Sequence, residues 1–201
     1  MVDMVGNKNV SGKIYPRARI RNAVVSKYLV GKVLDVGCSD RVGQFDSMPL
    51  DYVGIDPDVE AVERLQGKGI NAVVGSVYDL DKMFSLNSFD TVICLGVLTH
   101  LQNVGLAVEQ IEKVLKPSGL ALFSLHNAYD IQRILHKDFK DPEDYHYQVF
   151  TEEHFQNLLE DNGLKIVKLY HIPNFWFSRL VTRINPRYCD DLLFVTKKVM
   201  K

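Results

Sequence analysis

Two aspartates stand at the ends of short apolar runs in the first third of the chain. Asp35 lies in "VLDVG", just before Gly37, and Asp56 ends "DYVGID", 19 residues after Gly37. In an open parallel sheet, ligands bind beyond the carboxyl ends of the strands, and this spacing suits one crossover between neighbouring strands. A carboxylate at the second position accepts both hydroxyl hydrogens of a ribose. The pattern predicts a site for a nucleoside-containing ligand.

The residues of the loop "GCSDRVG" at 37–43 indicate which kind of nucleoside ligand the site would bind. A pyrophosphate requires G-x-G-x-x-G and a bare helix N-terminus, whose N–H groups meet its oxygens. Here Gly37 is followed by Ser39 and Arg41, and Asp40 adds negative charge to that of Asp35. S-adenosylmethionine carries a cationic sulfonium and ammonium beside its adenosine and has no phosphate. The acidic loop therefore favours this cofactor over NAD.

The elements expected to position this loop alternate along the chain. Apolar runs predict strands over 32–37, 51–56, 70–76, 88–97, 120–127, 164–172 and 191–199. Apolar periods and caps predict helices over 17–29, 57–69, 104–119 and 151–163. Pro57 is expected in the first turn of the second helix, and Pro117 with Gly119 at the end of the third.

Strands that alternate with helices imply an α/β fold, a doubly wound and mostly parallel Rossmann-like sheet. The last two predicted strands have no long predicted helix between them. They are therefore expected to form an antiparallel pair at one edge.

Composition narrows the class of protein. The 201 residues fit one domain, and the net charge of -1 provides no bulk attraction for nucleic acid or an anionic membrane. No apolar run approaches the roughly 18 residues of a transmembrane segment, and the polar N-terminus lacks the apolar core of a secretory signal. Three widely spaced cysteines suit neither a disulfide framework nor a zinc site. A cytoplasmic protein without a bound metal is expected.

Five motifs resemble, in order and spacing, those of the class I S-adenosylmethionine-dependent methyltransferases. They are "VLDVGCSD", "YVGIDPD", "GSVYDL", "SFDTVICLGVLTHL" and "VLKPSGLALFSLHN", and "YHYQVFTEEHFQNLLEDNGLKIVKL" continues the match. The resemblance covers roughly residues 15–198 and extends to the branch that includes quinone-biosynthesis and many small-molecule methyltransferases. It implies a seven-stranded sheet in the order 3-2-1-4-5-7-6, with the last strand antiparallel.

The resemblance also implies a cofactor site built from several loops. Its expected members are Arg17, Asp35, Gly37, Cys38, Ser39, Asp56, Pro57, Ser76, Val77 and Leu95. Residues 35–39 would border the methionine part, and Asp56 would hold the ribose hydroxyls. Ser76 and Val77 would lie beside the adenine edge, and Leu95 would line the pocket. Taken alone, Asp56 equally suggests a helix N-cap before Pro57, and the full set of motifs favours binding.

Arginines ahead of the first strand are a further expected part of this site. In this branch such an arginine often binds the carboxylate of the cofactor. Arg17 has the nearest spacing, with Arg19 and Arg21 as alternatives.

The acceptor side carries no decisive motif. His100, His126 and His146 are the candidate general bases, although His100 is more typical of a packing histidine. Segments 128–150 and 173–189 are expected to be acceptor-side insertions. Their aromatic residues suit a small-molecule or lipid-like acceptor, and equally suit packing on the sheet.

The segment 175–188 is basic and amphipathic. It suggests a cover over the edge strands more than a contact with an anionic acceptor or a membrane.

The sequence therefore predicts one methyltransferase domain over 1–201, with residues 1–30 as an N-terminal helical cap. The expected reaction is methyl transfer from S-adenosylmethionine to a small-molecule or lipid-like acceptor, without nucleic acid as a partner. The alternative is a cofactor-binding protein without transfer activity that serves as a partner subunit. An NAD-dependent oxidoreductase is disfavoured because the glycine fingerprint is missing.

Overall fold

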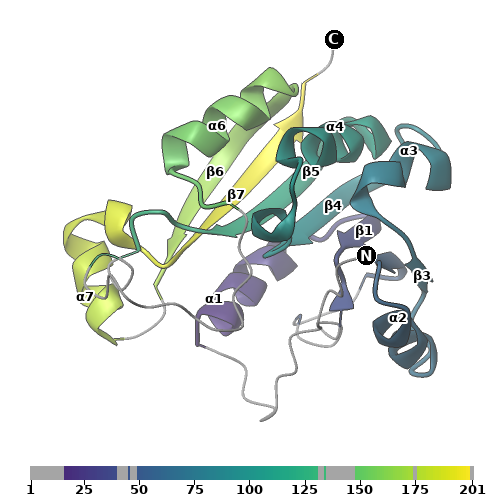
Figure 1. Ribbon diagram of the computed structural model, residues 1–201, viewed down its shortest axis with the longest axis horizontal. Coiled ribbons are helices and arrows are strands. Elements are labelled where there is room, and N and C mark those ends of the chain that lie inside the picture. Colours follow the sequence, from purple (N-terminus) through teal and green to yellow (C-terminus); the bar gives the residue numbers. More distant parts are fainter. Residues whose placement is uncertain are drawn as a thin grey trace.

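The computed structural model describes residues 16–39, 45, 49–130, 134, 148–173 and 176–199 (Figure 1). His146, Arg41 and most of the expected insertion 128–150 lie outside these residues. The described strands are β1 Lys32–Val36, β2 Asp51–Asp56, β3 Ala72–Val74, β4 Phe89–Leu95, β5 Leu115–His126, β6 Leu164–Ile172 and β7 Asp191–Lys198. The described α-helices are α1 Pro16–Val25, α2 Val59–Gln66, α3 Leu80–Met83, α4 Val104–Val114, α6 Glu152–Asp161 and α7 Trp176–Ile184.

The seven strands form one sheet in the order β3-β2-β1-β4-β5-β7-β6. Strands β1 to β5 pair in parallel, whereas β7 pairs antiparallel with both β5 and β6. The predicted fold class, strand order and antiparallel edge are confirmed. The order reverses direction at the β1–β4 boundary, where the chain first extends the sheet toward β3 and then returns to add β4 on the other side.

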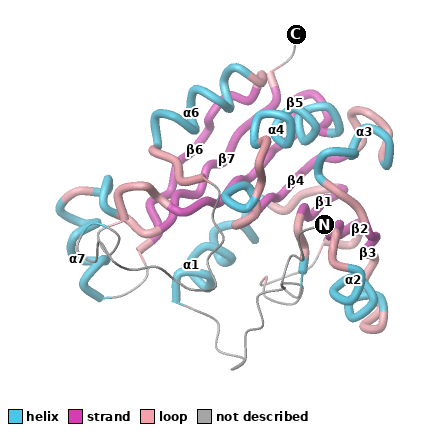
Figure 2. Tube along the Cα trace, viewed as in Figure 1, coloured by secondary structure: helices cyan, strands magenta, loops and turns pink. Residues whose placement is uncertain are grey.

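Both faces of the sheet are covered by helices (Figure 2). Along β4, Val92 and Cys94 belong to the core shared with α4 and α6, while Ile93 and Leu95 belong to the core shared with α1. Both neighbours of each buried side chain are thus buried too, on the opposite face. This double burial explains why the strands read as continuous apolar runs rather than as alternating ones.

Two predicted boundaries were wrong. Helix α2 begins at Val59 rather than at Pro57, because Asp58 is its N-cap and accepts hydrogen bonds from the N–H groups of Glu60 and Ala61. Helix α4 ends at Val114, and residues 115–119 belong to β5 rather than to the helix. Pro117 explains the second difference, since proline disfavours the helical conformation of the residue before it.

The region after β6 contains a helix that was not predicted from the sequence. Residues Trp176–Ile184 form the helix α7, and Pro186–Tyr188 form a short 3-10 turn that leads into β7. Helix α7 lies at the end of the sheet opposite the C-terminus (Figure 1). Since β6 and β7 are antiparallel to each other, and β7 to β5, the segment lies at the same sheet end as the carboxyl end of β5.

Candidate functional site

The loop after β1 lies at the point where the strand order reverses. Gly37 has a φ of 66°, and a Cβ added to it would collide with Cγ2 of Val97, which follows β4. Glycine is thus required twice, for the left-handed backbone and for the close approach of two loops. Loops at such a reversal border the ligand crevice in open α/β sheets.

The N–H groups of this loop point to protein acceptors. Those of Gly37 and Cys38 donate to the carbonyl of Ile55, at 2.8 and 3.0 Å, and that of Ser39 donates to Asp56 Oδ2 at 2.9 Å. A phosphate-binding loop instead directs such groups at the ligand. The geometry of residues 37–39 therefore fits a ligand without phosphate.

Asp56 lies at the centre of the loops that follow β1, β2 and β3. Its Oδ1 accepts from the N–H of Asp58 at 2.9 Å, and its main-chain carbonyl accepts from the N–H of Gly75 at 3.0 Å. A carboxylate has about four lone-pair positions. The N–H groups of Ser39 and Asp58 occupy two of them, so the group keeps capacity for two hydroxyl donors, as a ribose would present. The helix-capping alternative for Asp56 is wrong, since Asp58 caps α2.

The loop after β3 brings Ser76 and Val77 next to this group. The hydroxyl of Ser76 accepts from the N–H of Tyr78 at 3.2 Å and caps the 3-10 turn Val77–Asp79. Val77 is buried in the core on the α4 face. Pro57 connects Asp56 to Asp58, the N-cap of α2. Main-chain hydrogen bonds from Gly37 to Ile55 and from Gly75 to Asp56 hold the loops after β1, β2 and β3 to one another.

Two predicted site residues are buried beneath the loops. The Asp35 side chain is fully buried and accepts a hydrogen bond of 2.9 Å from the hydroxyl of Tyr52. Cys38 is also fully buried and packs with α2 residues Val62 and Leu65. Both residues are fully buried, so their side chains support the loop from below.

The loop after β4 completes the rim, and α1 lies over it. Leu95 is buried on the α1 face, in the cluster that contains Val25. A Cβ built at Gly96 would lie 4.0 Å from Nη1 of Arg21, so this guanidinium reaches the carboxyl end of β4. Arg17, one turn earlier in α1, reaches Asp191 instead, with Nη1 3.9 Å from Oδ1.

A second polar cluster lies at the carboxyl end of β5. Nδ1 of His126 is 2.7 Å from Oδ1 of Asp191, the first residue of β7, which pairs with His126 in the sheet. Burial raises the pKa of the Asp191 carboxyl, but the His126 hydrogen bond and the charges of His126, Arg17 and Arg21 outweigh it and lower the pKa below its usual value. The group is therefore a carboxylate that accepts from the His126 ring, which fixes the orientation of that ring.

Sequence reasoning selected His126 but missed Asp191. The two residues are 65 positions apart, so no local spacing connects them. The sequence signal for a buried Asp191 was its place at the start of "DLLFVT". This run is so apolar that both faces of the strand are expected to be buried. His100, by contrast, is exposed at the end of the 3-10 turn Leu98–His100.

We expect the Asp191→Asn variant to be less stable than the native protein at neutral pH, by about 1.5–3 kcal/mol for a lost charge-assisted hydrogen bond. The lowered pKa means that this stabilisation is present above the unfolded-state value of about 3.9. It is lost as the pH falls through the folded-state pKa, because the native carboxyl then also takes a proton. Urea unfolding at a series of pH values measures the difference. An equal difference on both sides of this range would contradict the ionic role of Asp191.

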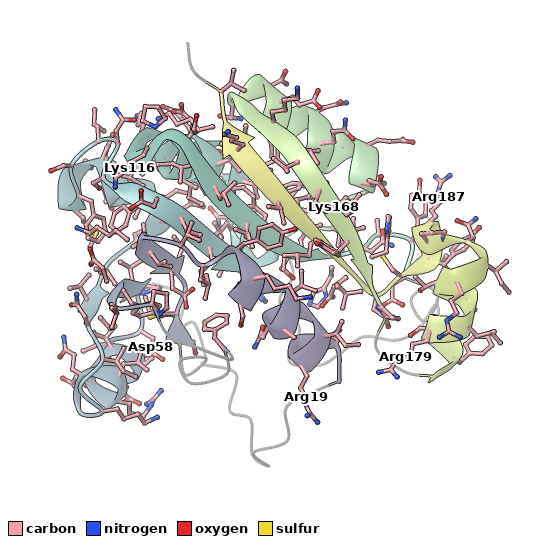
Figure 3. The ribbon with its side chains drawn as sticks, turned by 180° about the vertical axis from the view of Figure 1, so that it is seen from behind. Arg19, Asp58, Lys116, Lys168, Arg179 and Arg187 are labelled. Atoms are coloured by element: carbon pink, nitrogen blue, oxygen red, sulfur yellow. The ribbon has the colours of Figure 1, made fainter. Side chains whose placement is uncertain are left out.

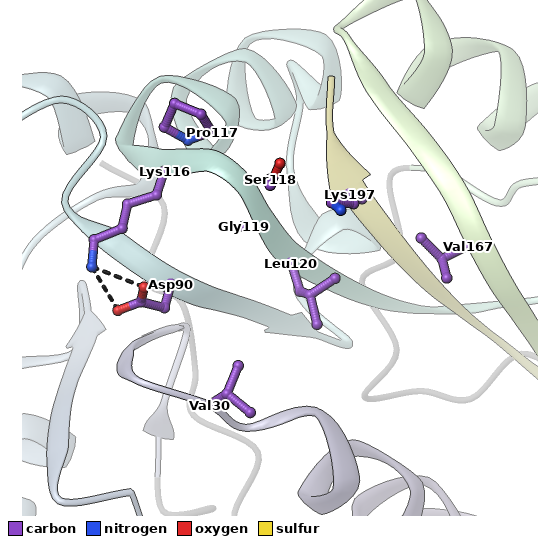
Figure 4. A pocket seen from close by; sticks show the side chains of 9 residues that line it. All are labelled: Val30, Asp90, Lys116, Pro117, Ser118, Gly119, Leu120, Val167 and Lys197. Carbon is purple, nitrogen blue, oxygen red and sulfur yellow. Dashed lines mark hydrogen bonds and ion pairs between the residues drawn. The ribbon is translucent and has the colours of Figure 1, made fainter. Parts of the chain in front are cut away.

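A surface pocket of about 440 Å³ lies at the other end of the sheet, near the starts of β1 and β4 (Figure 4). Asp90 and Lys116 face each other there, with Lys116 Nζ 2.7 Å from Asp90 Oδ2. Oδ2 also accepts from the N–H of Lys32, and the Lys116 hydrogen bond lowers the pKa of the Asp90 carboxyl. These contacts join the N-terminal ends of β1, β4 and β5. The pocket is remote from the loops after β1, β2 and β4, so we assign Asp90 a structural role.

Comparison with known proteins decides the family. A family model described as a methyltransferase domain matches residues 15–169. The chain belongs to the class I S-adenosylmethionine-dependent methyltransferases. A crystal structure of an S-adenosylmethionine-dependent methyltransferase from Archaeoglobus fulgidus has the same fold, with a TM-score of 0.70 at 18% identity over 90% of this chain and 92% of that one. Family and fold together imply S-adenosylmethionine binding.

Relatives with a name are similar to this chain over only part of their length. The ubiquinone biosynthesis O-methyltransferase of Rickettsia conorii is 32% identical over 109 residues, which is 48% of this chain and 35% of that protein. The mitochondrial ubiquinone biosynthesis O-methyltransferase of Rattus norvegicus is 28% identical over 156 residues, or 67% of this methyltransferase and 44% of the rat protein. The chain thus spans less than half the length of either relative. Among the helices that the structure describes, none has the length and apolarity needed to cross a membrane.

Proposed function

We propose that this methyltransferase transfers a methyl group from S-adenosylmethionine to a small, lipid-like acceptor. The observation that carries the proposal is the convergence of three loops, around Gly37, Asp56 and Gly96, at the reversal of strand order. These loops offer the Asp56 carboxylate with two remaining acceptor positions, and no N–H cradle at residues 37–39 for a phosphate. Membership of the methyltransferase family supports S-adenosylmethionine as the cofactor.

The proposed cofactor contacts follow from this arrangement. Asp56 would accept from the two ribose hydroxyls, and the main chain at Ser76 and Val77 would border the adenine. The loop at Gly37 would lie along the methionine part, with Leu95 beneath it as part of the pocket wall. When bound, the cofactor supplies a methyl group on a cationic sulfonium. The chain supplies orientation, which contributes about 7–11 kcal/mol when reactants are well aligned.

Arg21 is the arginine that we propose for the cofactor carboxylate, because its Nη1 would lie 4.0 Å from a Cβ built at Gly96, at the carboxyl end of β4. We expect Arg21→Ala to weaken S-adenosylhomocysteine binding by about 10- to 150-fold, the equivalent of 1.5–3 kcal/mol for a charge-assisted hydrogen bond. Arg17→Ala should change that affinity less. Titration calorimetry of both variants is the measurement, and a larger loss for Arg17→Ala would return the role to Arg17, the first expectation from the sequence.

His126 is our proposed general base for an acceptor that must lose a proton. It ends β5, and when Nδ1–H donates to Asp191 the neutral ring carries its acceptor lone pair on Nε2. A base at this position would contribute about 10²–10⁴-fold to the rate. Asp191 acts as a positioning residue, since it contacts His126 and orients it.

The acceptor class rests on the aromatic segments and on the relatives, whose printed names refer to ubiquinone biosynthesis. The experiment is methyl transfer from radiolabelled S-adenosylmethionine to a cell extract divided into lipid, other small-molecule, protein and RNA fractions. We expect label in the lipid fraction, and much less of it with an Asp56→Ala variant at the same cofactor concentration. Label confined to RNA or protein would overturn the acceptor, and binding of S-adenosylhomocysteine without any transfer would favour the partner-subunit alternative.

A further inference from the structure

Helix α7 presents apolar side chains to solvent. Phe177, Leu180 and Ile184 are 42%, 51% and 80% exposed, whereas Ser178 is fully buried. Positions 177, 180 and 184 follow the helical repeat and therefore form one stripe along the outer side of the helix. The buried Ser178 lies on the opposite side, which shows that the helix is seated on the protein with its apolar stripe outward.

Basic residues run beside this stripe. Arg179 and Arg183 are both exposed and are one turn apart, so they flank the apolar residues on one side. Arg187 follows in the 3-10 turn, and the segment 175–188 contains no aspartate or glutamate. Arg179 and Arg187 both project from this end of the molecule (Figure 3). The segment 175–188 is therefore positively charged although the net charge of the chain is -1, and Glu153 of α6 is the acid that acts on Arg187.

The segment is firmly joined to the acceptor side of the sheet. The Asn127 side chain, just after β5, donates to the carbonyls of Arg187 and Cys189 at 2.8 Å each. The guanidinium of Arg187 lies 4.1 Å from the ring centre of Tyr129. A surface that docks on α7 would therefore lie close to the carboxyl end of β5 and to His126.

We infer that α7 docks this protein onto an anionic lipid surface. An exposed apolar stripe with arginines along its side is the pattern of a helix that lies in the membrane interface. Nucleic acid is disfavoured, because Leu180 and Ile184 offer neither stacking nor hydrogen bonds to it. A second copy of the chain is disfavoured as well, since the same face on both partners would bring the arginines together.

The charge and length of α7 also set the strength of docking. The nine residues span about 14 Å and expose the apolar side chains of Phe177, Leu180 and Ile184, a small area to bury, so binding is reversible. Each arginine near an anionic surface contributes about fivefold to the binding constant, and salt screens this contribution. The inference stands apart from methyl transfer, although a lipid surface would suit the proposed acceptor.

The test is binding of the purified full chain to two kinds of vesicle, phosphatidylcholine alone and phosphatidylcholine mixed with phosphatidylglycerol. We expect sedimentation with the mixed vesicles, little with phosphatidylcholine alone, and release at high salt. The only tryptophan of the chain, Trp176, begins α7, so its fluorescence should shift to shorter wavelength on binding.

Matched variants locate the surface. Leu180→Asp with Ile184→Asp should lower binding at least about tenfold, and Arg179→Gln or Arg183→Gln about fivefold each. Val167→Asp, at a β6 residue that is 56% exposed, and Arg64→Gln in α2 make the same chemical changes elsewhere and should leave binding intact. Retained S-adenosylhomocysteine affinity and circular dichroism show that each variant is folded.

Three results would overturn the inference. They are no binding of the native protein to mixed vesicles, equal losses in the two controls, and a dimer in solution that Leu180→Asp converts to a monomer while vesicle binding is absent. Failure of methyl transfer with vesicle binding intact would instead count against the proposed function alone.

Discussion

The Gly37→Ala variant is expected to be strongly destabilised and to lose most of its cofactor affinity. An alanine in the left-handed conformation that Gly37 adopts costs about 1–2 kcal/mol. Its Cβ would also collide with Val97, and overpacking of this kind costs about 1–3 kcal/mol more. Because Val97 follows β4, relief of the collision would separate two loops of the proposed site. Urea unfolding and calorimetry with S-adenosylhomocysteine measure the two effects.

Gly69 provides the matched control for this substitution. It has a φ of 75°, and nothing lies within 4 Å of a Cβ built there, so Gly69→Ala should show the backbone cost of about 1–2 kcal/mol alone. The double variant Gly37→Ala with Val97→Ala should recover the steric part but not the backbone part. Equal losses for Gly37→Ala and Gly69→Ala would mean that the Gly37–Val97 approach carries no energetic weight.

The Asp56→Ala variant should bind S-adenosylmethionine and S-adenosylhomocysteine at least about 10- to 150-fold more weakly. This range corresponds to about 1.5–3 kcal/mol for one hydrogen bond to a charged group, and a ribose would form two. Asp56 also holds the N–H groups of Ser39 and Asp58, so the loops after β1 and β2 lose a common acceptor. Calorimetry gives the affinity, and thermal unfolding shows how much of the loss comes from altered folding.

Asp58→Asn tests whether the effect belongs to Asp56 itself. Asp58 is two residues away and caps α2, and asparagine caps a helix about as well as aspartate. This variant removes one negative charge from the same loop and should leave cofactor affinity within a factor of a few. If Asp56→Ala remained folded with unchanged affinity, the ribose assignment would be wrong.

The positions of the strands were predictable because apolar runs are local features of the chain, whereas their order was implied by the resemblance to the methyltransferase family. Runs such as "VLDVG" and "DLLFV" are mostly apolar and do not alternate, and a strand covered on both faces needs no alternation. The boundaries that failed lie where local signals compete. The helix-like period before Pro117 continues into β5, and only the pairing of Leu115 with Phe89 assigns that residue to the sheet.

The polar partnerships of the site were less accessible from the sequence. Asp56 was identified because it ends the apolar run "DYVGID", a feature that the sequence shows directly. The pairs His126–Asp191 and Arg17–Asp191 join positions far apart along the chain, and they exist because β7 runs antiparallel beside β5. The choice between Arg17 and Arg21 likewise depends on which turn of α1 faces Gly96.

By itself the sequence determined the strand-end positions of Gly37 and Asp56, because apolar runs mark where the strands end. The family and the sheet order followed from the resemblance of its motifs to those of the methyltransferases. The tertiary structure alone decided that the 37–39 N–H groups are turned to Ile55 and Asp56, that Asp191 orients His126, and that α7 turns an apolar, arginine-flanked side outward. Those features depend on the packing of elements that are distant in the chain. Packing sets side-chain direction and burial, whereas local sequence sets only the tendency to form each element.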